Sequence, residues 1–333
     1  MELKFLENVD YYKSSLIDYS NLKSGIIYPQ KKFFNKEDFI KYRNNYSMGI
    51  PILAPLGLDY FEYDLKNKYT LSQNDISELI FSSVNENYIG VERFVSRGLN
   101  FCSEVIPKNK YLDIVKLIDD YNIKQKNIIK KYSIKGYSIA AFQTRNLPHF
   151  GHETIINYLL EKVDYVVINP LVGPKKKNDI NFSVLIKAYE YLIDNKFNDR
   201  LMILPVIANM FYAGPREACH HAIIRKNLGF THFVVGRDHA GAENIYKPEL
   251  AVETVKKYEK EIDIKILDIK GAAYCQKCKK SIIIGSCNHN NIFLKDISGS
   301  DFRKSLKGRQ EYKYADIGLQ KFIYKYQDKI FIN

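Results

Sequence analysis

The residues best suited to chemistry lie together in one short stretch of this 333-residue chain: Gln143, Thr144, Arg145, Asn146, His149 and His152. The two histidines share one face of a first helical turn, because residues three apart are neighbours on a helix. Gly151 between them lacks a side chain, which lets a ligand approach the backbone. Free N–H groups at a helix start and the guanidinium of Arg145 both suit phosphate or another oxyanion. This spacing predicts an anion-binding site, and the alternative is two histidines that are satisfied within the protein.

A second stretch of similar character follows the apolar run over 231–235, and it contains Gly236, Arg237, Asp238, His239 and Ala240. Arg237 can neutralise phosphate charge, and His239 can donate a hydrogen bond to phosphate. The alternative is an ordinary loop with a surface Arg–Asp pair. Ligands of parallel α/β sheets bind beyond the carboxyl ends of the strands, so we expect both stretches to meet at one edge of the sheet.

Two further segments could each contribute a cation. Arg216 follows Gly214 and Pro215, which are typical of a helix start, and it could face the cleft or pair with a carboxylate. Ser298 can cap a helix, and the start of that helix together with Arg303 would form another phosphate site. A helix cap without a ligand is the alternative for this last segment.

Four residues with metal-ligating side chains fall between positions 275 and 289: Cys275, Cys278, Cys287 and His289. Thiolates and an imidazole at this spacing suit tetrahedral zinc in a knuckle. Zinc here would be structural, because no open coordination position is implied. The second pair is closer than Cys-x2-Cys, and a reduced, metal-free loop is the alternative. Cys102 and Cys219 stand at apolar positions, where we expect buried thiols.

From position 137 onward, apolar runs alternate with segments of helical periodicity, which indicates right-handed crossovers and a parallel sheet. The expected strands cover 137–142, 165–168, 201–205, 231–235 and 262–269. The expected helices cover 149–163, 184–195, 215–228 and 244–260, and a further helix is expected over 110–131. The predicted fold class is therefore α/β.

Composition and charge exclude several classes of protein. Apolar residues make up 46% of the chain and charged residues 26%, which is typical of a globular protein. No apolar run is long enough to cross a membrane, and the first ten residues lack the apolar core of a signal peptide, so we expect a cytoplasmic protein. The net charge of +12 comes from scattered lysines, which favours a solvated surface over a nucleic-acid-binding stripe.

The stretch over 212–241, together with those around Arg145 and Ser298, resembles the ATP sulfurylase (sulfate adenylyltransferase) family, one of the His-x-Gly-His nucleotidylyltransferases. The resemblance covers about residues 137–306. It implies a Rossmann-like catalytic domain over 137–270 and a smaller mixed, β-rich, PUA-like domain over 1–136. A C-terminal zinc-knuckle segment over 271–333 would complete the active site.

The family's reaction joins sulfate to the α-phosphate of ATP and releases pyrophosphate. By resemblance, sulfate would be held by Gln143, Arg145 and the backbone of Ala240. The implied catalytic residues are Thr144, Arg145, Asn146 and His149. The implied nucleotide-binding residues are Gln143, Asn146, His149, His152, Gly236, Arg237, Asp238 and His239. Magnesium would accompany ATP, and relatives are commonly homo-oligomers.

Both substrates are negatively charged, so this site would need hydrogen-bond donors and cations more than a general base. Sulfate and ATP together bring about six negative charges to one cleft, and sulfate is already ionised. Two departures from the family pattern bear on the acceptor: Pro148 stands one place later than in many relatives, and Phe211 stands where many carry arginine. The alternatives are a nucleotidylyltransferase of the same fold with another acceptor, and a zinc-containing RNA-binding module.

Overall fold

A five-stranded parallel sheet forms the centre of the molecule, in a computed structural model that describes residues 14–45, 49–82, 87–174, 178–197, 199–236, 239 and 245–332. The strand order is β11-β10-β5-β6-β8. The strands are β5 (Ile139–Phe142), β6 (Tyr165–Ile168), β8 (Leu201–Ile203), β10 (His232–Gly236) and β11 (Lys265–Ile269). Every neighbouring pair is parallel, which confirms the predicted α/β class.

The strand order reverses beside β5, because the chain runs from β5 through β6 to β8 and then returns to β10 on the other side of β5. Such a switch point opens a crevice at the carboxyl ends of the two central strands. The connecting helices are α7 (Phe150–Leu160), α8 (Phe182–Lys196), α9 (Pro215–Leu228), α10 (Leu250–Lys257) and α11 (Glu259–Ile262). The two anion-binding stretches predicted from the sequence therefore follow adjacent strands, β5 and β10.

Local sequence signals placed most of these elements correctly. Helix α9 begins at Pro215 and ends at Leu228 as predicted, with Gly229 in the left-handed conformation at its end (φ 103°). The helix expected over 244–260 is instead two helices, α10 and α11, which meet at Tyr258. A short parallel pair, β7 (Leu171–Val172) with β9 (Val206–Ile207), was not expected and extends the carboxyl-end side of the sheet.

The region before position 137 contains more helix than strand in its described part, so the predicted β-rich character is wrong there. Its strands form two antiparallel pairs of three residues each, β1 (Phe61–Tyr63) with β4 (Val105–Pro107) and β2 (Lys68–Thr70) with β3 (Asn100–Cys102). The helices are α2 (Ser14–Lys23), α3 (Lys36–Asn45), α4 (Gln73–Phe81), α5 (Ile89–Val95) and the long α6 (Leu112–Ser133). The PUA-like assignment stays a prediction.

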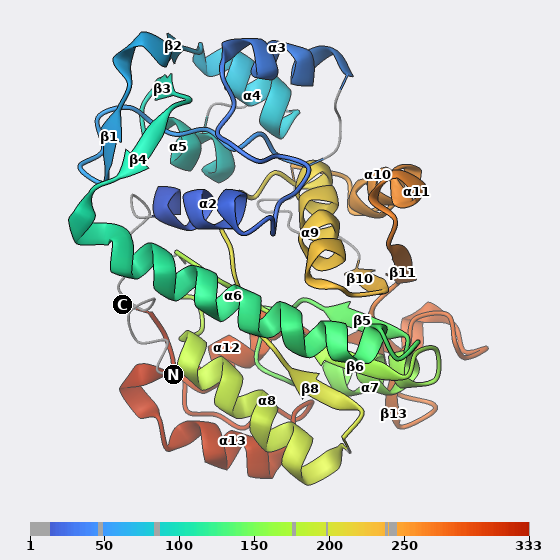
Figure 1. Ribbon diagram of the computed structural model, residues 1–333. Coiled ribbons are helices and arrows are strands. Elements are labelled where there is room, and N and C mark those ends of the chain that lie inside the picture. Colours follow the sequence, from blue (N-terminus) through green and yellow to red (C-terminus); the bar gives the residue numbers. More distant parts are fainter. Residues whose placement is uncertain are drawn as a thin grey trace.

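One apolar core joins this region to the sheet. Ile80, Phe101 and Phe233 belong to the same cluster of buried side chains, although they come from the N-terminal region and from β10. In Figure 1, α6 crosses the molecule between the N-terminal elements above it and helices α8 and α13 below it. The predicted helix over 110–131 is confirmed as α6. No described helix has the length and apolar character that a membrane crossing requires.

The C-terminal region adds a small antiparallel sheet and two helices beside α7. The sheet has the order β13 (Lys280–Ile283), β12 (Ala272–Cys275) and β14 (Leu294–Asp296), and it is followed by α12 (Gly299–Lys307) and α13 (Ile317–Tyr324). Phe302 of α12 and Leu319 of α13 share a second apolar cluster with Ala140 of β5. The C-terminal region thus packs directly on one face of the sheet.

Candidate active site

A cavity of about 540 Å³ lies at the carboxyl ends of β5 and β10. It is lined by the whole first group of predicted residues: Gln143, Thr144, Arg145, Asn146, His149 and His152. Gly236, which ends β10, and His239, which follows it, line the same cavity. Three other predicted residues, Arg237, Asp238 and Ala240, lie outside the described residues. The switch point of the sheet therefore brings the two stretches to one wall, as the alternation of strands and helices predicted.

The two histidines at the start of α7 are held by short-range contacts. The Gly151 N–H donates to Nδ1 of His149 over 3.2 Å, so in the neutral ring Nε2 carries the proton and can donate to a ligand. A Cβ on Gly151 would lie only 3.0 Å from the His149 ring, which explains the glycine. Nε2 of His152 lies 3.2 Å from the Thr144 hydroxyl oxygen, so His152 orients Thr144 at the cavity.

Burial keeps both imidazoles uncharged at neutral pH. It lowers the pKa of His149 to about 4, and it lowers the pKa of His152 well below the usual value, with the neighbouring His149 adding to the effect. The rings therefore act as neutral hydrogen-bonding groups, and the positive charge at the cavity comes from arginine and lysine side chains such as Arg145 and Lys270.

Arg145 lines the cavity, and a second arginine, Arg303, lies near enough to feel its charge. Nη1 of Arg145 is buried and has no hydrogen-bond partner among the described residues. Nη1 of Arg303, from α12, donates to the Asn146 side-chain oxygen over 2.6 Å. Partial burial and the charge of Arg145 lower the pKa of Arg303. A buried donor without a partner is costly. The repulsion between the two cations, which the Asp179 carboxylate offsets in part, would be relieved further by a bound anion.

The start of α12 packs against Asn146 so closely that only glycine fits. A Cβ on Gly299 would lie 2.5 Å from the Asn146 side-chain carbon. Ser298 caps this helix by accepting the Asp301 N–H over 3.0 Å, as the sequence suggested, and Ser298 also lines the cavity. The predicted phosphate site at this helix start is therefore part of the same cavity as Arg145.

Arg216 does not reach the cavity. Its Nη1 donates to the Tyr42 hydroxyl over 2.9 Å and its Nε to the Ser82 hydroxyl over 3.3 Å. Phe211 is also buried away from the cavity, and its neighbour Tyr212 forms the cavity wall instead. Arg216 therefore neither faces the cavity nor pairs with a carboxylate as the two alternatives had it, because its hydrogen-bond partners are two hydroxyl groups.

The N-terminal region contributes to this wall, which the sequence did not reveal. Tyr212 has a positive φ of 62°, and its carbonyl accepts a hydrogen bond from the Tyr88 hydroxyl at the start of α5. The Arg93 guanidinium of α5 lies 5.3 Å from the centre of the Tyr212 ring. These contacts join residues more than a hundred positions apart, so no local pattern in the sequence indicated them.

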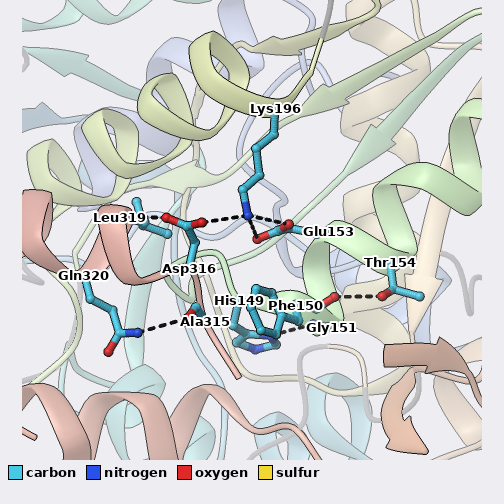
Figure 2. Close-up of polar contacts among 10 residues, drawn as sticks. All are labelled: His149, Phe150, Gly151, Glu153, Thr154, Lys196, Ala315, Asp316, Leu319 and Gln320. Atoms are coloured by element: carbon cyan, nitrogen blue, oxygen red, sulfur yellow. Dashed lines mark hydrogen bonds and ion pairs between the residues drawn. The ribbon is translucent and has the colours of Figure 1, made fainter. Parts of the chain in front are cut away.

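The C-terminal segment holds the start of α7 in place, as Figure 2 shows. The Lys196 ammonium of α8 lies 3.0 Å from carboxylate oxygens of both Glu153 and Asp316. Asp316 also caps α13 by accepting the Leu319 N–H over 2.8 Å. In addition, the Phe150 N–H donates to the Tyr314 carbonyl over 2.8 Å. Helices α7, α8 and α13 are thus tied together beside His149.

We expect the substitution Lys196→Met to lower the melting temperature by about 2–6 °C. The change keeps the apolar stem but leaves two half-buried carboxylates without their shared cation, a loss of about 1–2 kcal/mol. Thermal unfolding measured by circular dichroism tests this expectation. The matched control is Lys321→Met on the exposed face of α13. Equal melting temperatures for the two variants would contradict the role given to Lys196.

Acid is expected to destabilise the protein because several histidines are buried in the neutral form. Burial lowers the pKa of His149 to about 4 and that of His220 to about 3, and it also lowers the pKa of His152, His221 and His239. Between about pH 6.5 and the lowered pKa, the unfolded chain binds more protons than the folded one, so stability falls as the pH falls. At pH 5, His149 and His220 each account for about 2 kcal/mol.

Two buried carboxyl groups work in the opposite direction. Burial raises the pKa of Glu217 to about 7 and that of Asp18 to about 6, and these groups favour the folded state as the pH falls. Five histidines outweigh two carboxyls, so the melting temperature at pH 5.0 should lie more than about 5 °C below that at pH 7.5. Calorimetry at both pH values measures the difference, and a higher melting temperature at pH 5.0 would refute the assignment of neutral buried histidines.

The four predicted metal ligands gather at one point beside β12. Their ligand atoms all lie within 4.8 Å of one another. Nδ1 of His289 is 3.5 Å from the sulfur of Cys275 and 3.3 Å from that of Cys278, and the sulfurs of Cys287 and Cys275 are 3.9 Å apart. Tetrahedral zinc with Zn–S bonds of about 2.3 Å separates its ligands by about 3.8 Å. The cluster therefore has dimensions that fit such an ion, whereas Cys102 and Cys219 are buried thiols elsewhere.

Comparison with known proteins finds related sequences along most of this chain. Residues 119–313 match the family model of ATP-sulfurylase. The sulfate adenylyltransferase of Persephonella marina is 34% identical, over 92% of this chain and 86% of the relative. That of Ignicoccus hospitalis is 33% identical, over 94% and 88% of the two chains.

A solved structure with a similar fold is the hexameric APS kinase from Thiobacillus denitrificans. Its TM-score is 0.59 at 12% identity, and the alignment covers 96% of this chain and 62% of that one. At this identity the similarity supports the fold alone. The family match and the relatives confirm the resemblance in sequence, and this chain belongs to the ATP-sulfurylase family.

Proposed function

We propose that this chain catalyses the transfer of the adenylyl group of ATP to sulfate, with release of pyrophosphate, in the cavity beyond β5 and β10. The observation that carries the proposal is the buried Nη1 of Arg145, a donor at the cavity with no partner among the described residues, together with the nearby charge of Arg303. Such a site is complete only when an oxyanion occupies it. The relatives named sulfate adenylyltransferase support sulfate as that oxyanion.

In the proposed reaction a sulfate oxygen attacks the α-phosphorus in line with the departing pyrophosphate. The new bond joins the sulfate oxygen to phosphorus, and the bond between phosphorus and the α–β bridging oxygen breaks. Pyrophosphate leaves with the electron pair. No proton is transferred in this step, so the protein needs no general base, and positioning with charge stabilisation supplies the catalysis.

Each residue at the cavity has a proposed role in this step. Gln143, Arg145 and the backbone of Ala240 hold sulfate, whereas Thr144 and Asn146 position the α-phosphate. Nε2 of His149 donates to the phosphate oxygens, which is consistent with its other nitrogen accepting from Gly151. His152, Gly236, Arg237 and Asp238 complete the nucleotide side, and His239 also lines the cavity. Arg303 adds a cation that approaches through Asn146.

Two metal ions accompany this proposal. Magnesium would neutralise part of the ATP charge, and Asp179 and Asp296 line the cavity with the carboxylate oxygens that magnesium prefers. Zinc would bind to Cys275, Cys278, Cys287 and His289 and would be structural, because the four ligands leave no open position. We also propose that the protein is cytoplasmic and that it forms a homo-oligomer. Light scattering after size-exclusion chromatography can test the oligomeric state.

The test of the function is release of pyrophosphate from ATP as a function of added sulfate. We expect release to depend on sulfate and to continue without a stable product when molybdate replaces it. Release that is independent of sulfate but dependent on another acceptor would favour the other nucleotidylyltransferase reaction. A salt-dependent gel shift with RNA, together with no turnover, would favour an RNA-binding module.

A further inference from the structure

A buried carboxylate joins two walls of the cavity. Glu217, on α9, is completely buried, and both of its oxygens accept backbone hydrogen bonds, from Phe211 over 2.7 Å and from Ala213 over 2.8 Å. These two bonds hold the turn in which Tyr212 has its positive φ. Because Tyr212 lines the cavity, Glu217 fixes one wall without touching the cavity itself.

The same carboxylate begins a chain of three side chains, Glu217–His221–His239. Nε2 of His221 lies 3.2 Å from Oε1 of Glu217, within ion-pair distance, although it makes no hydrogen bond to any described residue. Nδ1 of His221 lies 3.0 Å from Nε2 of His239. His239 lines the cavity, so this chain connects Glu217 to the second wall.

The chemistry of the chain sets the position of each proton. Burial and the charge of Arg225 lower the pKa of His221 and His239, so each ring carries one proton at neutral pH. Above its pKa of about 7, Glu217 is a carboxylate and can only accept. Its oxygen that faces His221 already accepts the Phe211 N–H, so an unprotonated Nε2 of His221 would face an oxygen lone pair. The proton of His221 is therefore on Nε2, its Nδ1 accepts, and the proton of His239 is on Nε2.

We infer that Glu217 is a positioning residue of this site, which holds His239 through His221 in the tautomer with an unprotonated Nδ1 and holds Tyr212 through its backbone. The inference rests on the proposed function for its kinetic consequence, although the tautomers do not depend on it. An unprotonated Nδ1 cannot donate to a phosphate oxygen. His239 then anchors its loop through Nε2, which differs from the phosphate-donor role expected from the sequence.

A pair of substitutions separates anchoring from ligand contact. The amide of His239→Gln can place a donor where Nε2 was, whereas that of His239→Asn lies near the position of Nδ1. If His239 acts as an anchor, His239→Gln keeps at least about tenfold more kcat than His239→Asn. If His239→Asn is the more active variant, the ring acts on the substrate through Nδ1 and the inference is overturned.

The substitution Glu217→Gln tests the origin of the chain. The carboxylate accepts the Phe211 and Ala213 N–H groups and faces Nε2 of His221, whereas an amide must turn its NH2 toward one of these groups. We expect kcat to fall by about tenfold or more while the dissociation constant for ATP, measured by calorimetry, changes less than threefold. Glu253→Gln, on the exposed side of α10, is the control for loss of one negative charge.

A spectroscopic signature makes the test independent of turnover. The chain has seven histidines, and in protein labelled with 15N-histidine the two ring nitrogens of each report the tautomer. At pH 8, where Glu217 is ionised because its pKa is about 7, both His221 and His239 should be protonated at Nε2. Glu217→Gln should change the signals of these two rings together.

The outcomes are distinguishable. Absence of sulfate-dependent release by the unmodified protein would reject the proposed function and leave the tautomer result to decide this inference. Unchanged ring signals in Glu217→Gln, or kcat within twofold of the parent, would overturn the inference while the proposed function stands. If Glu217→Gln fails to fold, as circular dichroism would reveal, the comparison of the two His239 variants decides.

Discussion

Replacing Arg145 with alanine is expected to lower kcat/KM for sulfate by about 10²- to 10³-fold, the loss that follows removal of one preorganised donor at a developing charge. The guanidinium lies in the cavity, and its buried Nη1 has no partner among the described residues. This donor is therefore available to hydrogen-bond a ligand. The measurement is sulfate-dependent release of pyrophosphate. The variant should fold, because it loses a costly unpaired donor.

Two further substitutions make the Arg145 result specific. Lysine at position 145 keeps the charge but loses the planar fork, so Arg145→Lys should recover only part of the activity. Arg216→Ala is the matched control, since that side chain is half-buried and pairs with Tyr42 outside the cavity. Near-normal turnover by Arg145→Ala would remove the basis for placing sulfate there.

Loss of the proposed zinc ion is expected to abolish activity and to unfold the small C-terminal sheet. Cys275 ends β12 and pairs in register with Leu294 of β14. The chain leaves β14 through Asp296, Ile297 and Ser298, which line the cavity, and enters α12 with Arg303. Three small strands have little apolar core of their own, so metal binding would contribute much of their folding energy.

Cys275→Ser tests this coupling between the metal cluster and the cavity. We expect one zinc ion per parent chain by elemental analysis, and a variant with less than about a tenth of the zinc and no measurable turnover. Cys219→Ala is the control, because that buried thiol lies outside the cluster and its loss should leave the zinc content unchanged. A parent protein that contains no metal and keeps full activity after chelation would contradict the structural role of zinc.

Sheet order explains why the site could be predicted in outline from the sequence. Gln143 and Gly236 each directly follow an apolar run, and a parallel sheet places the carboxyl ends of such runs on one edge. The sequence did not specify that β10 pairs with β5, and that pairing is what places His239 and Arg145 at one cavity. Strand order depends on packing between distant segments, which no local pattern encodes.

The contacts that complete the site were beyond sequence reasoning for the same reason. Arg303 reaches Asn146 across 157 residues of chain, and Arg93 reaches Tyr212 from the N-terminal region. Arg216 could have faced either way, because the pattern of α9 did not reveal which neighbours would cover each face. The structure turns Glu217 and His221 inward on this helix and pairs Arg216 with Tyr42.

The sequence by itself determined the local features: the α/β class, the limits of α9, the cap at Ser298, and the spacing of the four metal ligands. Periodicity, capping and ligand spacing act over a few residues, so they can be read along the chain. Only the tertiary structure decided that the N-terminal region is mainly helical in its described part and that a buried Glu–His–His chain reaches the cavity. Those features depend on side chains that are far apart in the sequence and become buried together. Their energies depend on neighbours that only the folded chain provides.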